Sequence, residues 1–310
     1  MLLVVLLLAC GAPETADPSV GGGSTTPTTA PASDAPFTVV VIPDTQYYTL
    51  SNPGVLDEIV TWILEHREEH NIAFVLQEGD VTHNNTEVEW QNADAAFGRL
   101  DGVVPYTVCV GNHDIGDDGD TSRFNSWFGA DRFAGMATFG GSRREAKNDD
   151  HFHTFAAGGT EWLVVSLSYD PEGAQLAWAN RVFADHPAHR GIVLTHAYLL
   201  PDGNLGPEGE ALWDEVVQWA PGLTFVLNGH YIAGTEARRV STGDAGNPVY
   251  ELFVNYQDLP LGGMGQVRLL HLDPAAGRFD VQTCSAWDVC LDDEATAYGY
   301  DGVDLGPVVP

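Results

Sequence analysis

Residues that commonly bind metal ions follow five apolar runs of this chain. In chain order, with the preceding run in parentheses, they are Asp44 and Gln46 (FTVVVIP), Asp80 (IAFVLQE), Asn112, His113 and Asp114 (YTVCV), His196 (GIVLT) and His230 (LTFVLN). Carboxylate, amide and imidazole groups are hard to intermediate ligands that suit Mn, Fe, Zn or Mg. A centre built from such ligands can activate water, so the pattern predicts a metal-dependent hydrolase.

The apolar runs themselves indicate where these side chains lie. Short runs rich in Val, Ile and Leu are typical of buried strands. In α/β proteins, functional side chains stand just beyond the carboxyl ends of such strands. We therefore expect the five clusters to meet at one edge of a sheet, although they are far apart in the sequence.

Strands and helices alternate from Phe37 onwards. We expect strands at 37–43, 72–77, 104–110, 151–156, 161–168, 191–195, 223–227, 235–241, 248–255, 266–272 and 278–283, and helices at 53–69, 86–100, 121–128, 172–185 and 208–219. The first part has the βαβ order of parallel strands with right-handed crossovers, and the last four strands have hairpin spacing. This order predicts an α/β fold in which two sheets pack face to face with helices outside. The irregular segment 115–150 interrupts the order and is the expected substrate-facing insertion.

The composition limits the classes of partner. A chain of 310 residues with 44% hydrophobic residues can fill a sizeable core. Its formal net charge of −31 repels nucleic acid and anionic membranes, so we expect no nucleic-acid-binding patch. A phosphorylated substrate is still compatible with this charge, because bound cations reverse the local sign at a site. The acidic residues are dispersed along the chain, which favours a role in solubility.

The N-terminus has the pattern of an export signal. Residues 1–9, MLLVVLLLA, are too short to span a bilayer, and Leu7-Leu8-Ala9-Cys10 resembles a bacterial lipoprotein signal that is lipidated on Cys10. An ordinary signal peptide cut nearby is the alternative. Residues 11–36, rich in Gly, Ala, Pro, Ser and Thr, predict a flexible linker. We expect an exported protein, lipid-anchored to the bacterial cell envelope or else periplasmic or secreted, whose oligomeric state the sequence leaves open.

The remaining cysteines divide into a single residue and a close pair. Cys109 lies inside an apolar run, which favours a buried structural thiol. In an exported protein, Cys284 and Cys290 favour a disulfide that closes a small loop. A zinc knuckle would need further Cys or His ligands nearby. We therefore predict a catalytic domain at 37–283 and a C-terminal tail at 284–310 that contains the disulfide loop.

In this order, the clusters resemble the motifs of the calcineurin-like metallophosphoesterases. Those motifs are Asp-x-His, Gly-Asp, Gly-Asn-His-(Asp/Glu), a lone His and Gly-His-x-His, each at a strand end. The resemblance covers residues 37–283, and Gly79-Asp80 together with Gly111-Asn112-His113-Asp114 is its most specific part. The Asp44-Thr45-Gln46 variant is similar to a bacterial exported branch. The resemblance implies a four-layer αββα sandwich of two mixed sheets flanked by helices, with a centre of two divalent metal ions.

The resemblance also implies a ligand set for the two ions. Asp80 would bridge them, since a carboxylate has two oxygens with several lone pairs. Asn112, His196 and His230 would bind one ion together with Asp80. Asp44 would bind the other ion, together with Asp80 and the side-chain carbonyl of Gln46.

Two neighbouring residues would act on the substrate. His113 would donate a proton to the leaving group or stabilise the transition state, and Asn112 and His113 would contact the substrate. Asp114 would accept the other N–H of His113 and fix its tautomer. The implied activity is hydrolysis of phosphomonoesters or phosphodiesters through a metal-activated hydroxide.

Two positions depart from the family pattern. Gln46 stands where the family has His, and Ile232 stands where the second His of Gly-His-x-His belongs. Both losses fall on the ion bound by Asp44, so that site should be weak or should prefer a hard ion such as Mg or Mn. The alternative is a degenerate metal-binding module without catalysis, used for surface interactions. Retention of His113 and Asp114 favours the enzyme. We interpret His83 as a surface or packed histidine. Gln257 could meet substrate, but we interpret it as structural or solvated.

Overall fold

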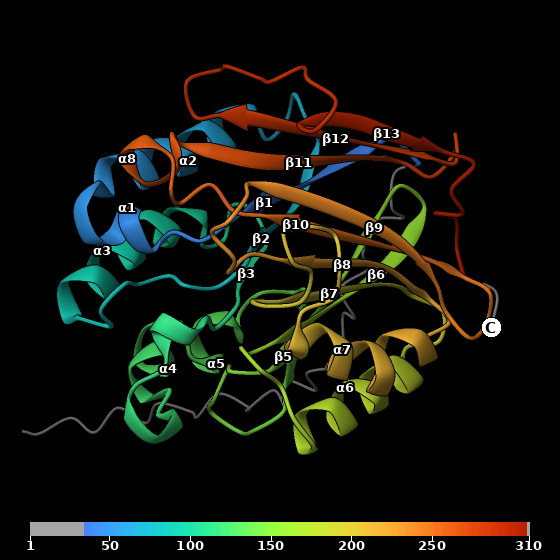
Figure 1. The fold of residues 1–310 in the computed structure, drawn as a ribbon, viewed down its shortest axis with the longest axis horizontal. Helices are drawn as coiled ribbons and strands as arrows, with labels where there is room; N and C mark the ends of the chain where they lie inside the picture. The colour runs from blue at the N-terminus through green and yellow to red at the C-terminus, as the bar shows by residue number, and fades with distance from the viewer. Residues whose placement is uncertain (1–33, 309–310) are drawn as a thin grey trace, which may run out of the picture. The chain divides into compact units, whose positions relative to one another are not determined.

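Two mixed β-sheets form the centre of the fold in the computed structural model, which describes residues 34–308 (Figure 1). The six-stranded sheet has the order β13 (Ala297–Asp301), β12 (Arg278–Ser285), β11 (Gln266–Asp273), β1 (Phe37–Ile42), β2 (Ile72–Gln77) and β3 (Tyr106–Val108). The seven-stranded sheet has the order β4 (Phe139–Ser142), β5 (His151–Ala157), β6 (Thr160–Leu167), β7 (Arg190–Thr195), β8 (Leu223–Asn228), β10 (Pro248–Val254) and β9 (Glu236–Thr242). Strands β1 to β3 run parallel, and so do β6, β7, β8 and β10.

Helices cover the outer faces of both sheets. Their bounds are α1 (Gln46–Ser51), α2 (Pro53–His66), α3 (Glu87–Phe97), α4 (Ser122–Phe128), α5 (Ala130–Phe133), α6 (Ala174–Asp185), α7 (Pro207–Glu215) and α8 (Pro260–Gly263). Figure 1 shows α1, α2 and α3 beside the six-stranded sheet, and α6 and α7 beside the seven-stranded sheet. The predicted α/β sandwich of two mixed sheets flanked by helices is therefore confirmed.

Strand β1 shows how the layers are built from the sequence. Val40 and Ile42 pack among residues of α2 and α3, whereas Val39 and Val41 pack in the core between the two sheets. Side chains of a strand alternate between the two faces of its sheet, so a strand buried on both faces reads as a continuous apolar run. A third apolar core lies between the seven-stranded sheet and helices α6 and α7.

Local signals in the sequence set the starts of the helices beside the six-stranded sheet. Helix α2 has Pro53 in its first turn, where its missing N–H removes no intrahelical bond. Helix α3 begins with a capping box between Thr86 and Glu89, which satisfies two backbone donors of the first turn. Helix α2 follows the Asp44 cluster after the short helix α1, and helix α3 is the first helix after Asp80.

The structure differs from the predicted elements mainly at short segments. The predicted helix at 208–219 ends at Glu215 and continues as a 3₁₀ turn, and strand β3 is shorter than predicted. Strands β4 and β13 and the short helices α1, α5 and α8 were not expected. Strand β13 pairs with β12, so the domain boundary predicted after residue 283 falls inside β12, and part of the predicted tail belongs to the six-stranded sheet.

The N-terminal predictions concern residues that the structure does not describe. The signal peptide at 1–10 and all but the last three residues of the linker at 11–36 lie outside the described residues. Among residues 34–308, no helix has the length and apolar character needed to cross a bilayer.

A disulfide joins Cys284 and Cys290 and closes a small loop after β12. The loop is attached to helix α2, because Trp62 Nε1 donates a hydrogen bond of 2.7 Å to Asp288 Oδ1. Cys109 is a buried free thiol, as its position in an apolar run indicates.

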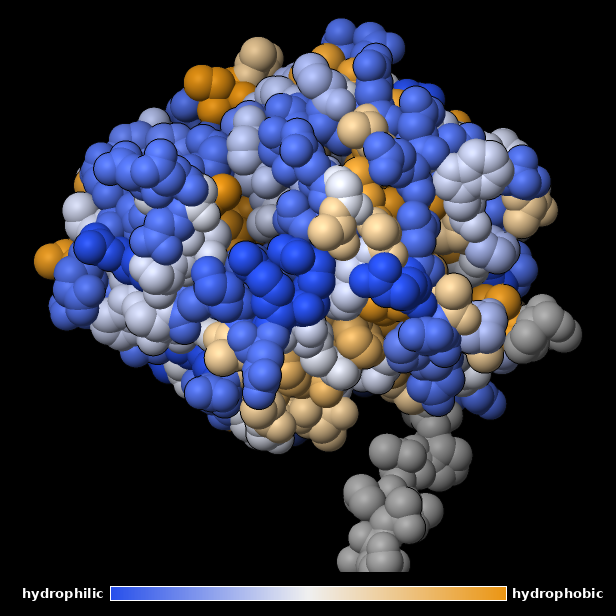
Figure 2. Space-filling view, turned by 90° about the horizontal axis from the view of Figure 1, so that it is seen from below, coloured by the Kyte–Doolittle hydropathy of each residue, from blue (hydrophilic) through white to orange (hydrophobic). Residues whose placement is uncertain are grey.

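Hydrophilic side chains cover most of the surface that can be seen from below the view of Figure 1 (Figure 2). Exposed acidic residues elsewhere in the described chain form ion pairs, including Asp57 with Arg99 and Asp280 with Arg278. Exposed pairs of this kind contribute little to stability. Dispersed acidic residues of this kind fit the predicted role in solubility.

Two fully buried histidines on β5 face the core between the sheets. His151 contacts Thr107 Oγ1 through Nε2 and the carbonyl oxygen of Asn148 through Nδ1, at 2.9 Å. His153 lies among aromatic rings, 5.4 Å from the ring of Phe74, and within the described chain its Nε2 has no hydrogen-bond partner. Burial, and then the neighbouring His151, lower the pKa of His153 well below its usual value.

His153→Phe should make the fold less sensitive to acid. Because the pKa of His153 is lowered on folding, the unfolded chain binds a proton that the folded protein excludes once the pH falls below about 6.5. Each such proton reduces the free energy of unfolding by up to about 1.4 kcal/mol per pH unit. Urea unfolding of both proteins at about pH 7 and about pH 5 should show a smaller loss in the variant. An equal loss would contradict a neutral buried His153.

Candidate metal centre

Four side chains from four strand ends converge on one point. His196 Nε2 lies 3.2 Å from Asp80 Oδ2, 3.1 Å from Asn112 Oδ1 and 3.2 Å from His230 Nδ1. Asp80 and Asn112 follow β2 and β3 of the six-stranded sheet, and His196 and His230 follow β7 and β8 of the seven-stranded sheet. The structure therefore brings together four of the predicted metal ligands, which lie just beyond the carboxyl ends of strands from both sheets.

The hydrogen bonds around His196 leave its inner nitrogen free to bind a cation. Nδ1 of His196 lies 2.8 Å from the carbonyl oxygen of Glu78, so Nδ1 donates there, and Nε2 is the nitrogen that faces the centre and that would bind a cation after it loses its proton. Asp80 Oδ1 accepts the backbone N–H of His113 at 2.9 Å, and Asp80 Oδ2 faces the imidazoles. A suitable atom from each of Asp80, His196 and His230 lies within 4.8 Å of the others, so these residues fit a divalent metal ion.

The electrostatics of these side chains fit the same interpretation. Burial raises the pKa of Asp80, but the positive charge of His196 and hydrogen bonds outweigh it, so the pKa of Asp80 is lowered. Burial lowers the pKa of His196, but Asp80 and Asp44 raise it to about 10. Burial and then the charge of His196 lower the pKa of His230 to about 4. A site that holds a proton between carboxylates in this way can exchange it for a metal ion.

Asp44 lies beside this cluster and is almost fully buried. Asp44 Oδ1 is 3.2 Å from the backbone nitrogen of His230, and Asp44 Oδ2 accepts a hydrogen bond of 2.9 Å from Asn255 Nδ2. Burial raises the pKa of Asp44 to about 7; the charge of His196 lowers the pKa and that of Asp80 raises it. Such a carboxylate is available to a second cation.

Two motif glycines are required by the close approach of backbone to these carboxylates. A Cβ on Gly111 would lie 2.2 Å from Asp80 Oδ1, and a Cβ on Gly229 would lie 2.1 Å from Asp44 Oδ1. Asp80 and His230 themselves have φ of 48° and 75°, in the left-handed region that most residues avoid. Strain of this kind at a non-glycine residue typically persists where surrounding contacts impose it, as at functional sites.

His113 lies next to the cluster, with one nitrogen engaged and the ring partly exposed. Its Nδ1 is 2.7 Å from the carbonyl oxygen of His83, and its ring stacks on the ring of His83 with centroids 4.9 Å apart. Nδ1 therefore donates, and Nε2 is the nitrogen available to a substrate.

The position of Asp114 corrects one expectation. We predicted that Asp114 would accept an N–H of the His113 ring, but the carbonyl of His83 takes that place. Asp114 instead accepts backbone N–H groups of Val81, Thr82 and Gly111 at 2.9–3.0 Å. The physical reason is that these amides, left unpaired where the two loops turn, surround its buried carboxylate. Asp114 is thus a positioning residue that ties the Asp80 loop to the Asn112 loop.

Sequence reasoning missed three residues at the centre. His83 was interpreted as structural, yet its Nδ1 lies 2.8 Å from Gln46 Oε1. Asn255 and Gln257 follow β10 and contact Asp44 and Gln46 respectively. The rule that polar residues beyond a strand end share one edge would have found Asn255 and Gln257, because β10 runs parallel to β8.

A polar cavity of about 540 Å³ opens beside His113. It is lined by His83, Asn84, Asn85, Asn112, His113, Ile115, Gly116, Asp117, Asp120, Ser122 and Arg123. Residues 115–123 belong to the insertion that we expected to face the substrate. Arg123 is the only Arg or Lys in this lining, and its Nη1 donates to the carbonyl oxygen of Asn85.

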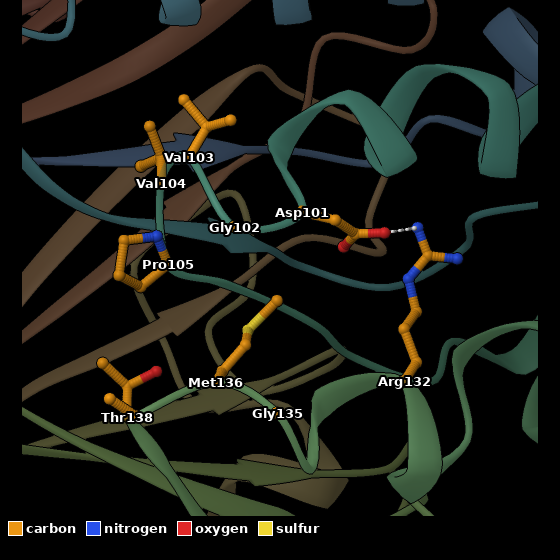
Figure 3. Close-up of a pocket in the computed structure, with 10 residues that line it drawn as sticks. Asp101, Gly102, Val103, Val104, Pro105, Arg132, Gly135, Met136 and Thr138 are labelled. Atoms are coloured by element: carbon orange, nitrogen blue, oxygen red, sulfur yellow. Dashed lines mark ion pairs between the residues drawn. The ribbon is translucent and has the colours of Figure 1, made fainter.

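A second cavity, of about 490 Å³, shares no lining residue with the first (Figure 3). Its one basic residue, Arg132, is already paired with Asp101 at 3.3 Å and also with Asp94. None of the predicted metal ligands lines it, so we do not assign the chemistry to this cavity.

Comparison with known proteins agrees with the fold and the motifs. Residues 37–232 match the model of the calcineurin-like phosphoesterase family. The chain is 34% identical over 264 residues to the uncharacterized protein YvnB of Bacillus subtilis (strain 168), covering 83% of this chain and 20% of YvnB. The chain thus spans about a fifth of the length of this relative.

Two solved structures share the fold at low identity. The purple acid phosphatase PPD1 from yellow lupin (Lupinus luteus) seeds has a TM-score of 0.55 and 15% identity, covering 87% of this chain and 54% of PPD1. GAP50, the anchor in the inner membrane complex of Plasmodium, has a TM-score of 0.50 and 9% identity, covering 86% of this chain and 88% of GAP50.

The chain belongs to the calcineurin-like phosphoesterase family. The four side chains that converge, Asp80, Asn112, His196 and His230, each follow the end of a strand within or beside the matched residues 37–232.

Proposed function

We propose that the protein is a metal-dependent phosphoesterase that hydrolyses phosphomonoesters or phosphodiesters at the centre formed by Asp80, Asn112, His196 and His230. The observation that carries this proposal is the convergence of a carboxylate, an amide oxygen and two imidazole nitrogens beside a polar cavity. When bound, divalent ions such as Mn, Fe, Zn or Mg would acidify water and polarise the phosphate oxygens.

The residues of the chain supply the remaining chemistry. His113 is held by the carbonyl of His83 with Nε2 available, so it can give a proton to the leaving oxygen or stabilise charge on the phosphate. Asn112 directs Oδ1 toward His196 Nε2, at 3.1 Å, and its Nδ2 is the donor left for a substrate oxygen. Both side chains line the same cavity, so substrate in this cavity would contact both.

A phosphate-ester assay tests the proposal directly. The unmodified protein with added Mn should hydrolyse a chromogenic phosphomonoester or phosphodiester, and a chelated sample should not. The ratio of the hydrolysis rate of the phosphomonoester to that of the phosphodiester shows which ester the enzyme prefers. Metal binding without hydrolysis of any ester in a broad panel would favour the alternative, a non-catalytic metal-binding module.

Arg123→Ala should weaken substrate binding with little effect on turnover. Arg123 is the cationic residue of the cavity lining and would pair with an anionic group of the substrate away from the reacting bond. Because Arg123 is exposed, we expect KM to rise by about 5- to 10-fold at low salt, and by less at high salt. Arg99→Ala, which removes an arginine outside the cavity, is the matched control. Equal KM values in Arg123→Ala and the unmodified protein would exclude this role.

We also propose that the protein is exported and is held at the bacterial cell envelope through Cys10. The support is the lipoprotein-like signal in the sequence and the disulfide between Cys284 and Cys290, a bond typical of oxidising compartments. Labelling with a fatty acid analogue, compared between the unmodified protein and Cys10→Ser, would test the anchor.

A further inference from the structure

The Asp44 side of the centre is lined by amide side chains. Gln46, Asn255 and Gln257 are each at most 5% exposed, and Asp44 is 1% exposed. Gln46 Nε2 lies 3.1 Å from Asp80 Oδ2 and also contacts Gln257 Oε1. One nitrogen atom therefore fills the space between a carboxylate oxygen and an amide oxygen that both face it.

We propose that Gln257, positioned by Asn255, is a ligand of a second cation at the Asp44 side, and that this site is built from oxygen atoms alone. The inference rests on the proposed function only in so far as that function uses a metal centre. At this site, Gln46 and Gln257, the latter from the loop after β10, would take the places of the imidazoles absent at positions 46 and 232. Ile232 itself is 59% exposed.

The oxygen set follows from the contacts of these side chains. The nitrogen and oxygen of a side-chain amide exchange places by a half-turn of the terminal torsion. After that turn, Gln46 would present Oε1 where Nε2 now faces Asp80 Oδ2 and Gln257 Oε1. His83 Nδ1, 2.8 Å from Gln46 Oε1, can accept from the turned amide in its other tautomer. Asp44, Asp80, Gln46 and Gln257 would then offer four oxygens to one cation.

Asn255 holds two parts of this set in place. Asn255 Nδ2 donates to Asp44 Oδ2 at 2.9 Å. Asp44 Oδ1 accepts the backbone N–H of His230 at 3.2 Å and keeps a further lone pair for the cation. Asn255 Oδ1 accepts the backbone N–H of Gln257 at 3.0 Å, which fixes the loop that carries the Gln257 side chain. Oxygen-only sites favour hard ions, so the second ion should be Mg or Mn rather than Zn.

Metal titration of the full chain tests the role of Gln257. Calorimetry with Mn should show one tight and one weaker ion in the unmodified protein. Gln257→Leu should keep the tight ion and weaken the second by about 10- to 100-fold, whereas Gln257→Glu, which keeps the oxygen and adds charge, should tighten it. Gln175→Leu is the matched control, because Gln175 also donates from its amide to a buried carboxylate, at 2.8 Å from Asp150 Oδ1.

The outcomes separate this inference from the proposed function. Unchanged binding of the second ion in both Gln257 variants, or no second ion in the unmodified protein, would overturn the inference, and Gln46 Nε2 would then stand in place of a cation. Two ions with the expected dependence on Gln257, but without ester hydrolysis, would leave the inference intact and remove the proposed function. Should Gln257→Leu fail to fold, Gln257→Glu alone tests the inference, because its affinity for the second ion should rise.

Discussion

Asp80→Ala should remove bound metal and with it the stabilisation that metal gives to the fold. Asp80 contributes Oδ2 to the cluster with His196 and is the one carboxylate that also contacts Gln46. A ligand that binds only the folded state, at 100 times its Kd, stabilises that state by about 2.7 kcal/mol. This difference between metal-loaded and chelated protein should be present in the unmodified protein and absent in the variant.

The measurement pairs elemental analysis with thermal unfolding, each with and without chelator. Asp57→Ala, which removes an exposed carboxylate of helix α2, serves as the control and should behave like the unmodified protein. Activity of Asp80→Ala should fall below detection. Folded Asp80→Ala protein that retains normal metal content would refute the assignment of Asp80 as a shared ligand.

His113→Ala should lower kcat by about 10²–10⁴-fold, the usual contribution of a general acid. His113 contacts the carbonyl of His83 and lines the cavity, but it is not among the convergent ligands, so the metal content should stay unchanged. A substrate with a good leaving group, which needs no protonation, should show a smaller loss than one with a poor leaving group.

A second substitution separates chemistry from packing at this position. His83→Ala removes the stacked ring but keeps the carbonyl that orients His113, so its loss of kcat should be much smaller than that of His113→Ala. Loss of metal from His113→Ala, or an equal effect for substrates with good and poor leaving groups, would contradict the role of proton donor.

The parts of the fold that strong patterns encode could be predicted from the sequence. Runs such as FTVVVIP and GIVLT are buried on both faces and have no alternative to a central strand, so β1 and β7 and the residues after them were placed correctly. The edge strand β13, AYGYD, has little apolar character, and its pairing with β12 is decided by tertiary contacts. Local patterns do not contain that information.

The candidate site was predictable in its ligands but not in its supporting contacts. Each ligand follows a strand end, and one rule therefore placed Asp80, His196 and His230 together. The partner of the His113 ring is a backbone carbonyl, a group that every residue carries and that no sequence pattern marks. Asn255 was placed inside the predicted strand at 248–255, and Gln257 was interpreted as structural or solvated, because no local pattern shows that its amide faces Gln46.

The origin of the ligands in two separate sheets links the metal centre to the stacking of the sandwich. The spacing of the sheets is set by core contacts such as that of Phe225 on β8 with Phe279 on β12, whose rings lie 5.0 Å apart. A bound ion would cross-link the two sheets at one edge without a covalent bond. Substitutions that thicken or thin this core should therefore alter metal affinity at a distance. The measured affinity for the ion would then report on the spacing between the two sheets.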